Sequence, residues 1–279
     1  MRMPRYPVYV PTKGRHDNCL TARFLIRDNV PFYLVVEPQE REQYLKYGEK
    51  NILVLPFSNQ GKGSIPARNW IKEHATKEGH PRHWQLDDNI RQTYRIHKKK
   101  RGPCASGVAF AVVEDFVDRY ENVAIAGLEY EMFGVRKMHP FTLNCRVYSC
   151  SLVNNAIPHK WRGRYNEDAD LCLQVLADGW CTVLFNAFLC DKQRTMTMGG
   201  GNTKDLYQGD GRLKMARSLE RVWPHIVTTD RRLQRPQHIV RDSWCSFKTP
   251  LIRKKDIDFS KFPKVDDYGM KLKQINKNH

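Results

Sequence analysis

Short apolar runs alternate with polar and amphipathic segments over residues 1–90 of the chain. The runs YPVYV, FYLVV, NILVL and HWQL have the length and composition of buried strands. The segments between them, such as LTARFLIRD, PQEREQYLKYG and IPARNWIKEHAT, have helical or polar character. This alternation predicts an α/β fold in which crossover helices connect and flank a mainly parallel sheet.

The middle of the chain adds further elements before the periodicity fades. IRQTYRIH, NVAIAGLEY, FTLNCRVYSCSLV and WCTVLFNAFL predict strands, and GVAFAVVEDFVDRY predicts a helix. EDADLCLQVLADG predicts a helix that stops at Gly179, and DGRLKMARSLERVWP predicts one that Pro224 ends. From about Arg231 the chain is polar and basic. We therefore expect a single domain over residues 1–228 and a basic C-terminal extension, residues 229–279, that packs on it or trails from it.

The stretch HWQLDDNI carries an apolar run directly into Asp87, Asp88 and Asn89. Ligands of parallel α/β sheets bind beyond the carboxyl ends of the strands, where the turns PTKGR and EPQE also fall. Hard oxygen donors at such an edge favour Mg²⁺ or Mn²⁺ bound to a diphosphate. Asp and Asn also favour turns and helix caps, so a purely structural role explains the three residues as well.

The charge balance points to a polyanionic partner. The chain of 279 residues has 47 Lys and Arg against 30 Asp and Glu, a net charge of +17. The excess is clustered beside candidate site residues, which favours nucleic acid, although solubility alone would also explain a basic chain. The eight cysteines form no CxxC pair, and no signal peptide or apolar run of membrane-spanning length is present. We therefore expect reduced thiols, no membrane association and a cytoplasmic protein.

Two separate segments resemble the GT-A glycosyltransferases. NQGKGSIPARNWIKEHATKEGHPRHWQLDDN combines a glycine-rich loop, a helix bearing Arg68 and Asn69, and the acidic strand end. It is similar to the nucleotide-sugar half of those enzymes, in which a G…ARN helix precedes a DxD-like motif. RYNEDADLCLQVLADGW resembles their xED element. An acid pair also suits the first turn of any helix, but its position after LDDN favours the functional interpretation.

The strings PTKGR, GKGSIPARN, WQLDDN, NEDADL and MGGGN together resemble the TET-associated glycosyltransferases, over about residues 6–224. That family occurs mainly in bacteriophages and is thought to glycosylate hydroxymethylated pyrimidines in DNA. The resemblance implies a GT-A-type, Rossmann-like fold and a UDP-sugar donor, with UDP-glucose expected first. It also implies Mn²⁺ or Mg²⁺, DNA carrying 5-hydroxymethylcytosine as acceptor, a monomer, and work in the host cell cytoplasm if the chain is phage-encoded.

The resemblance also assigns residues to roles. Asp168 would be the general base, with Glu167 beside it, and Asp87, Asp88 and Asn89 would hold the metal. Many GT-A enzymes add a late histidine ligand, and MTMGGGN contains none. The implied donor-binding residues are Pro11, Thr12, Lys13, Arg15, Glu37, Lys62, Arg68, Asp87 and Gly200.

Two basic clusters fit a DNA acceptor. HKKKRG, residues 97–102, follows the acidic strand end, and KWRGRY, residues 160–165, leads into the proposed base. Lysine and arginine bind phosphates, and Trp161 or Tyr165 would stack on an exposed base, although each cluster is also typical of a solvated loop. The candidate nucleic-acid-binding residues are Lys98, Lys99, Lys100, Arg101, Lys160, Trp161, Arg162 and Arg164.

Other functions stay open at this point. A GT-A glycosyltransferase acting on a protein or glycan would share the motifs, and its charge would be incidental. A catalytically inactive GT-A-like nucleic-acid-binding protein would share the fold, but it would have no use for both the DD and the ED carboxylates. A nucleotidyltransferase of similar fold is a third alternative.

Overall fold

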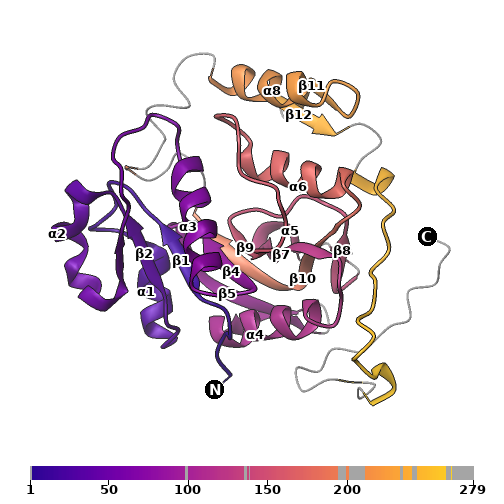
Figure 1. Cartoon of the computed structure of the whole chain (residues 1–279), viewed down its shortest axis with the longest axis horizontal. Helices are drawn as coiled ribbons and strands as arrows, with labels where there is room; N and C mark the ends of the chain where they lie inside the picture. The colour runs from indigo at the N-terminus through magenta and orange to yellow at the C-terminus, as the bar shows by residue number, and fades with distance from the viewer. Residues whose placement is uncertain are drawn as a thin grey trace.

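The computed structural model describes residues 2–97, 100–134, 137, 139–193, 199–200, 211–232, 235–240, 244–261 and 265. Within these residues the chain forms a 10-stranded sheet and a separate two-stranded sheet, with helices packed around the large sheet (Figure 1). The strands are β1 (Val8–Pro11), β2 (Tyr33–Val36), β3 (Ile52–Val54), β4 (Arg82–Leu86), β5 (Ile90–His97), β6 (Lys100–Cys104), β7 (Val123–Tyr130), β8 (Phe141–Leu143), β9 (Cys150–Asn154), β10 (Cys181–Lys192), β11 (Val227–Arg232) and β12 (Arg235–Val240).

The large sheet has the order β3-β2-β1-β4-β9-β7-β10-β5-β6, with β8 also paired to β10. β1 is parallel to β2 and β4, β2 is parallel to β3, and β7 is parallel to β10. β9 lies antiparallel between β4 and β7, so those two strands point the same way. β3, β2, β1, β4, β7 and β10 therefore share one direction, and their carboxyl ends meet at one edge. This arrangement confirms the predicted α/β class with a mainly parallel central sheet.

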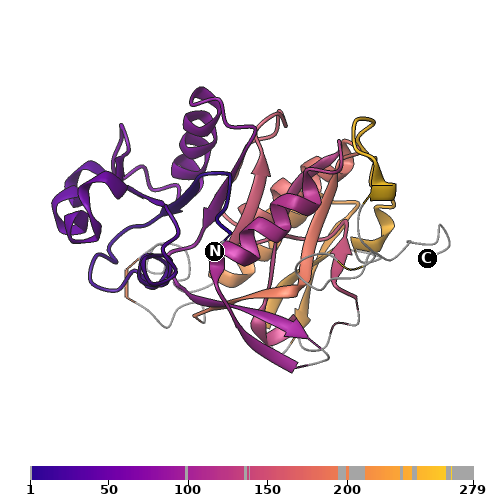
Figure 2. The ribbon, with the colours of Figure 1, turned by 90° about the horizontal axis from the view of Figure 1, so that it is seen from below.

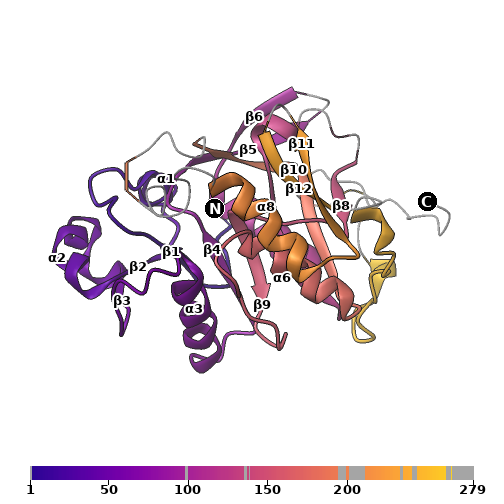
Figure 3. The same cartoon turned by 90° about the horizontal axis from the view of Figure 1, so that it is seen from above.

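Helices cover both faces of this sheet. Figure 2, viewed from below, shows α4 against one face, whereas Figure 3, viewed from above, shows α3, α6 and α8 over the other. One hydrophobic cluster joins α1 and α4 to the first face through residues such as Phe24 and Phe110. Ile65 and Leu171 belong to a cluster on the second face. The helices are α1 (Leu20–Arg27), α2 (Arg41–Tyr44), α3 (Ile65–Lys77), α4 (Ser106–Val117), α5 (Glu131–Gly134), α6 (Glu167–Ala177) and α8 (Gly211–Val222), with short 3₁₀ turns η1 (Pro38–Glu40), η2 (Leu45–Tyr47), η3 (Glu49–Asn51), η4 (Trp244–Ser246) and η5 (Phe259–Lys261).

The predicted boundary after residue 228 is wrong, because it cuts through β11. β11 and β12 form an antiparallel hairpin, and Val227 and Val240 pack with Leu219 of α8 against Leu173 of α6. The hairpin was not predicted because VTTDRR and RPQHIV are largely polar and bury few apolar side chains. Residues 211–240 therefore belong to the domain core as far as the structure describes them.

The later part of the predicted extension packs on the domain, which is one of the two arrangements expected for it. The side-chain amide of Asn122 donates to the carbonyl of Pro250 at 2.8 Å, and that of Asn144 donates to the carbonyl of Phe247 at 2.9 Å. Figure 1 shows this segment running beside β8.

Every cysteine whose side chain the structure describes is a free thiol. Among the described residues, no helix combines the length and apolar character that a bilayer span requires.

Candidate active site

The shared strand direction gathers polar side chains at one edge of the sheet. Thr12 follows β1, Asp87 and Asp88 follow β4, Tyr130 ends β7, and Lys192 ends β10. Parallel strands bring their carboxyl ends together, and ligands of α/β sheets bind beyond those ends. The structure therefore places the predicted strand-end carboxylates at the expected edge and adds side chains from β7 and β10.

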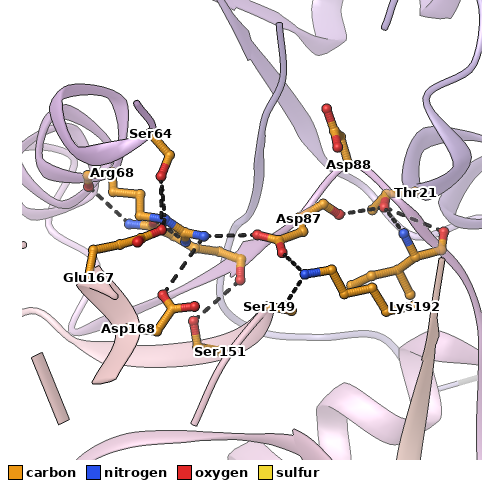
Figure 4. Close-up of polar contacts among 12 residues, drawn as sticks. Thr21, Ser64, Arg68, Asp87, Asp88, Ser149, Ser151, Glu167, Asp168 and Lys192 are labelled. Carbon is orange, nitrogen blue, oxygen red and sulfur yellow. Dashed lines mark hydrogen bonds and ion pairs between the residues drawn. The ribbon is translucent and has the colours of Figure 1, made fainter. Parts of the chain in front are cut away.

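The guanidinium of Arg68 joins the two acidic motifs (Figure 4). Arg68 lies in the first turns of α3, and its side chain is only 3% exposed. One nitrogen, Nη2, lies 2.8 Å from Asp87 Oδ1 and 3.9 Å from Asp168 Oδ1, and Nε lies 3.8 Å from Glu167 Oε1. Carboxylates from the end of β4 and the start of α6 thus meet on one buried cation.

Neighbouring polar groups fix the orientation of this guanidinium. The guanidinium donates from Nη1 to the side-chain oxygen of Gln85 and from Nε to the hydroxyl of Ser64, both at 3.4 Å. Ser64 in turn donates its hydroxyl to Glu167 at 3.1 Å. α6 begins after Asn166, whose backbone is left-handed with φ of 54°. Asparagine tolerates this conformation, and its amide donates to the carbonyl of Met215 at 2.6 Å. The local turn and α8 therefore hold the acid pair in place.

The surroundings of the carboxylates separate their pKa values. Burial raises the pKa of Asp168 to about 6, because the positive charge of Arg68 only partly offsets it while nearby negative charges add to it. Burial acts in the same direction on Asp87, but Lys192 and Arg68 outweigh it and hold the pKa of Asp87 well below its usual range. Carboxylates whose pKa values are pushed apart are typical of sites with divided acid–base roles.

Asp88 is bound to the loop after β1 and not to the Arg68 cluster. One of its oxygens pairs with Arg15, and the other accepts the hydroxyl of Thr12 at 2.9 Å. Tyr44 reinforces this loop, since its hydroxyl lies 2.9 Å from that of Thr12 and accepts the backbone N–H of Arg15 at 3.0 Å. Figure 4 shows the Asp88 carboxylate pointing away from that of Asp87. The adjacent residues Asp87 and Asp88 therefore belong to separate hydrogen-bond networks.

The other predicted donor-binding residues also lie around the loop after β1. Lys13 pairs with Glu37, which follows β2, at 2.9 Å and donates to Asn59 at 2.8 Å. Pro11 ends β1, and Lys62 is exposed in the loop before α3. Their roles in donor binding stay predictions.

Gly200 also reaches this loop. A Cβ on Gly200 would lie 2.2 Å from the carbonyl oxygen of Gly14, so only glycine permits this approach. Arg15 donates from Nε to the carbonyl of Gly199 at 3.2 Å. The described part of MGGGN is therefore in contact with PTKGR, as a shared donor site would require.

The predicted Mn²⁺ or Mg²⁺ ligands do not form a site that fits a divalent cation in this arrangement. The donor types are suitable, and the amide oxygen of Asn89 is buried without a hydrogen-bond partner. However, Asp87 binds Arg68 and Lys192 with its two oxygens, and both oxygens of Asp88 are also engaged. Across the described residues, no group of three or more His, Cys, Asp and Glu side chains is placed to hold a metal. The metal stays a prediction.

Lys192 is a site residue that the sequence interpretation missed. Its ammonium lies 2.7 Å from Asp87 Oδ2, 2.8 Å from Ser149 Oγ and 3.3 Å from the hydroxyl of Tyr130. Burial lowers the pKa of Lys192, but its interactions with Asp87 and Tyr130 together outweigh burial and raise that pKa above its usual value. The predicted strand WCTVLFNAFL stops at Leu189, whereas β10 continues to the lysine. The sequence signal that could have identified Lys192 was a basic residue shortly after the apolar run of a predicted strand.

The first basic cluster lies in the β5–β6 hairpin, away from the buried network. Lys98 and Lys99 lie outside the described residues. Lys100 and Arg101 are exposed, and Arg101 pairs with Glu131 and lies 4.8 Å from the ring centroid of Tyr94. Contact between this hairpin and nucleic acid stays a prediction.

In the second basic cluster, the expectation that Trp161 stacks on a DNA base is wrong. The Trp161 side chain is 3% exposed and packs in the hydrophobic cluster that contains Ile65 and Ile157. Its backbone N–H donates to the side-chain oxygen of Asn69 at 3.0 Å, which ties the loop to α3. The indole therefore fills core volume and is not available to a ligand.

The charged neighbours of Trp161 remain on the surface. Lys160 pairs with Glu73 at 2.8 Å, Arg162 pairs with Asp170 at 2.9 Å, and Arg164 is exposed. The Lys160–Glu73 pair is exposed on both sides and therefore weak, so Lys160 remains able to exchange its partner for a phosphate. Asp170, in contrast, is buried and accepts two hydrogen bonds from the half-exposed Arg162. Binding of Lys160, Arg162 and Arg164 to nucleic acid stays a prediction.

A sequence model described as TET-Associated Glycosyltransferase matches residues 6–201. The chain belongs to this family. It is therefore a nucleotide-sugar-dependent glycosyltransferase, and the edge that carries Arg68, Asp87 and Asp168 is its candidate active site. No curated protein matches the chain significantly.

Solved structures resemble this glycosyltransferase only distantly. An inositol-1-phosphate CTP transferase from T. maritima has 9% sequence identity and a TM-score of 0.38, and the match covers 75% of this chain and 94% of that one. A protein titled mannose-1-phosphate geranyltransferase, from Thermus thermophilus, has 13% identity and a TM-score of 0.31, with coverage of 67% and 58%. Neither likeness bears on the reaction.

Replacing Arg68 by Met should destabilise the glycosyltransferase strongly. Asp87, Glu167 and Asp168 would lose their shared buried cation, and breaking a buried ion pair costs about 3–5 kcal/mol of unfolding free energy. Urea titration followed by circular dichroism would measure this loss at neutral pH. The loss should shrink at about pH 5, because protonation removes unpaired charge.

The matched control is Arg41→Met. Arg41 also contacts carboxylates, Glu42 and Glu49, but on the surface, and its removal should leave the urea midpoint unchanged. An equal effect of both substitutions, or a loss in Arg68→Met that does not depend on pH, would contradict the role of Arg68 as a buried counter-charge.

Proposed function

We propose that this glycosyltransferase transfers the sugar of a UDP-sugar, with UDP-glucose as the first candidate, to a hydroxymethylated pyrimidine in DNA. The first candidate acceptor is 5-hydroxymethylcytosine. The observation that carries the chemistry is the meeting of Asp87, Glu167 and Asp168 on the guanidinium of Arg68. The net charge of +17 and the exposed basic clusters support a nucleic-acid acceptor.

In the proposed reaction Asp168 is the general base. The acceptor hydroxyl oxygen forms a bond to the anomeric carbon, the bond from that carbon to the diphosphate breaks, and its electron pair leaves with the nucleoside diphosphate. The hydroxyl proton passes to the carboxylate of Asp168. A base with a pKa of about 6 is largely ionised at neutral pH and still basic enough to accept a proton. Direct attack inverts the anomeric centre.

Glu167 and Arg68 position this base. The carboxylate of Glu167 is held by Ser64 and by Arg68, which leaves it oriented toward the cation. Arg68 in turn lies 3.9 Å from Asp168, near enough to steady the carboxylate without a direct hydrogen bond. Glu167 is therefore a positioning residue in this proposal, and Asp168 is the group that touches the acceptor.

DNA would reach Asp168 by presenting a hydroxymethylated nucleotide at this edge of the sheet. Extruding a base from a duplex costs a few kcal/mol, and contacts to phosphates offset that cost. Exposed Lys100 and Arg101 on β6, and Arg162 and Arg164 in the loop before α6, are the side chains proposed for these contacts. Because Trp161 is buried, the proposal assigns it no part in holding the extruded base.

Replacing Asp168 by Asn should lower the rate of transfer about 10²- to 10⁴-fold, because the amide cannot accept the proton. UDP binding, measured by calorimetry, should be retained. The base acts only when deprotonated, so the initial rate of the unmodified enzyme should fall as the pH drops through about 6 and level off above it. Unchanged turnover in Asp168→Asn would remove this residue from the mechanism.

Transfer itself is tested by incubating the protein with UDP-sugars and DNA that contains 5-hydroxymethylcytosine, with unmodified DNA as control. Mass spectrometry of the digested nucleosides should show a hexose-sized gain confined to the modified DNA. Release of UDP without such a gain would move the acceptor to a protein or glycan. Absence of both signals would favour an inactive nucleic-acid-binding protein.

Replacing Lys100 by Ala should weaken DNA binding without changing release of UDP from the donor. Removal of one phosphate-binding charge should reduce the slope of log affinity against log salt by about 1. Fluorescence anisotropy with labelled DNA at several salt concentrations would measure this slope. An unchanged slope would exclude the β5–β6 hairpin from DNA binding.

A further inference from the structure

Lys192 brings a positive charge to the site without a role in the proposed proton transfer. Its side chain is 15% exposed, and its ammonium contacts Asp87, Ser149 and Tyr130. Figure 4 shows it approaching Asp87 from the side opposite Arg68. Asp87 is therefore held between two cations, one from α3 and one from β10.

The sheet itself places this ammonium. β10 is parallel to β7 and antiparallel to β5, and its register against β5 shifts between Asp191 and Lys192, so that Lys192 pairs with Ile90. Beyond the strand, the backbone N–H of Gln193 donates to the carbonyl of Asn89 at 2.9 Å. The bulge re-aims the last side chain of β10 toward the end of β4. The contact with Asp87 thus depends on backbone pairing and not on a flexible loop.

The partners of Lys192 differ from those of Arg68. The guanidinium of Arg68 is nearly fully buried and surrounded by three carboxylates. Lys192 has one carboxylate partner, and its other two partners, Ser149 and Tyr130, are neutral hydroxyls whose oxygens lie 2.6 Å from each other. Those hydroxyls can satisfy one another, so a more strongly accepting anionic oxygen can take their place at the ammonium.

We propose that Lys192 supplies, at the diphosphate of the donor, the positive charge that a divalent cation supplies in metal-dependent transferases. The proposal rests on the nucleotide-sugar transfer described above. When the anomeric carbon–oxygen bond breaks, its electron pair and negative charge stay on the diphosphate, and the ammonium of Lys192 donates hydrogen bonds to that oxygen. Asp87 keeps the ammonium oriented. Neither the carbon–oxygen step nor the proton transfer then needs a metal.

The carboxylates at the end of β4 already bind cationic side chains, and this supports the assignment. A divalent cation at Asp87 would have to displace Lys192 or Arg68, and one at Asp88 would have to displace Arg15 or the hydroxyl of Thr12. Displacing a cation from a buried carboxylate leaves the displaced charge poorly solvated. In Lys192→Met that competitor is gone, and Asp87 gains an unoccupied oxygen.

Isothermal titration calorimetry of UDP binding, in EDTA and in Mn²⁺, tests the proposal without an acceptor. The unmodified protein should bind UDP about equally in both. Lys192→Met should lose about ten- to a hundredfold in affinity in EDTA, as expected for the removal of charge-assisted hydrogen bonds, and Mn²⁺ should restore much of it. Lys192→Arg, which keeps the charge, should bind UDP in EDTA better than Lys192→Met.

The matched control is Lys46→Met. Lys46 and Asp17 form another Lys–Asp pair with the same 2.7 Å separation, on the exposed surface. This variant should bind UDP like the unmodified protein in both buffers. Thermal melts followed by circular dichroism would check folding, and electron paramagnetic resonance of Mn²⁺ should show uptake in the presence of UDP by Lys192→Met but not by the unmodified protein.

Several outcomes would overturn the proposal. UDP binding by the unmodified protein that is lost in EDTA would assign the diphosphate charge to a metal and leave the glycosyltransferase function intact. Unchanged binding by Lys192→Met in EDTA would remove the lysine from the donor site. If Lys192→Met fails to fold, the unmodified protein and Lys192→Arg still decide between lysine and metal. Binding of neither UDP nor GDP in either buffer would count against the donor class and this proposal together.

Discussion

The buried guanidinium of Arg68 is the interaction on which the rest of the site depends. A charge removed from water is tolerated only when partners surround it, and here the partners come from the end of β4 and the start of α6. The site therefore exists only when α3, β4 and α6 are all in place. The second face of the sheet and the cluster of carboxylates around Arg68 therefore depend on the same packing of these elements.

The surroundings of each carboxylate, and not its residue type, decide its pKa and its binding partners. Asp87 lies between Arg68 and Lys192 and stays ionised, whereas the more weakly compensated Asp168 has a pKa of about 6, close to where a general base works best. Asp88 faces the loop after β1 and fastens it. The end of β4 thus contacts both the loop after β1 and, through Arg68, the acid pair at the start of α6.

The C-terminal hairpin supports α6, the helix that carries the proposed base. α8, β11 and β12 pack on α6 through an apolar cluster, Asn166 donates to the carbonyl of Met215, and Trp223 donates to Asp170 at 2.7 Å. This support extends the structural unit beyond the part of the chain that matches the family, which ends at residue 201. Because Trp161 is buried, the exposed charged side chains near it are those of Lys160, Arg162 and Arg164.

Local patterns in the sequence determined the apolar strands β1, β2, β3 and β4, the helices over residues 65–77 and 167–177, and the two acidic motifs, because apolar periodicity and strand-end chemistry are encoded within short segments. Tertiary structure alone decided the rest. Insertion of antiparallel β9 between β4 and β7, and the bulge that ends β10, bring Lys192 to Asp87. The burial of Trp161 and the orientation of Asp88 away from Asp87 likewise follow from neighbours distant in the chain, about which a local pattern carries no information.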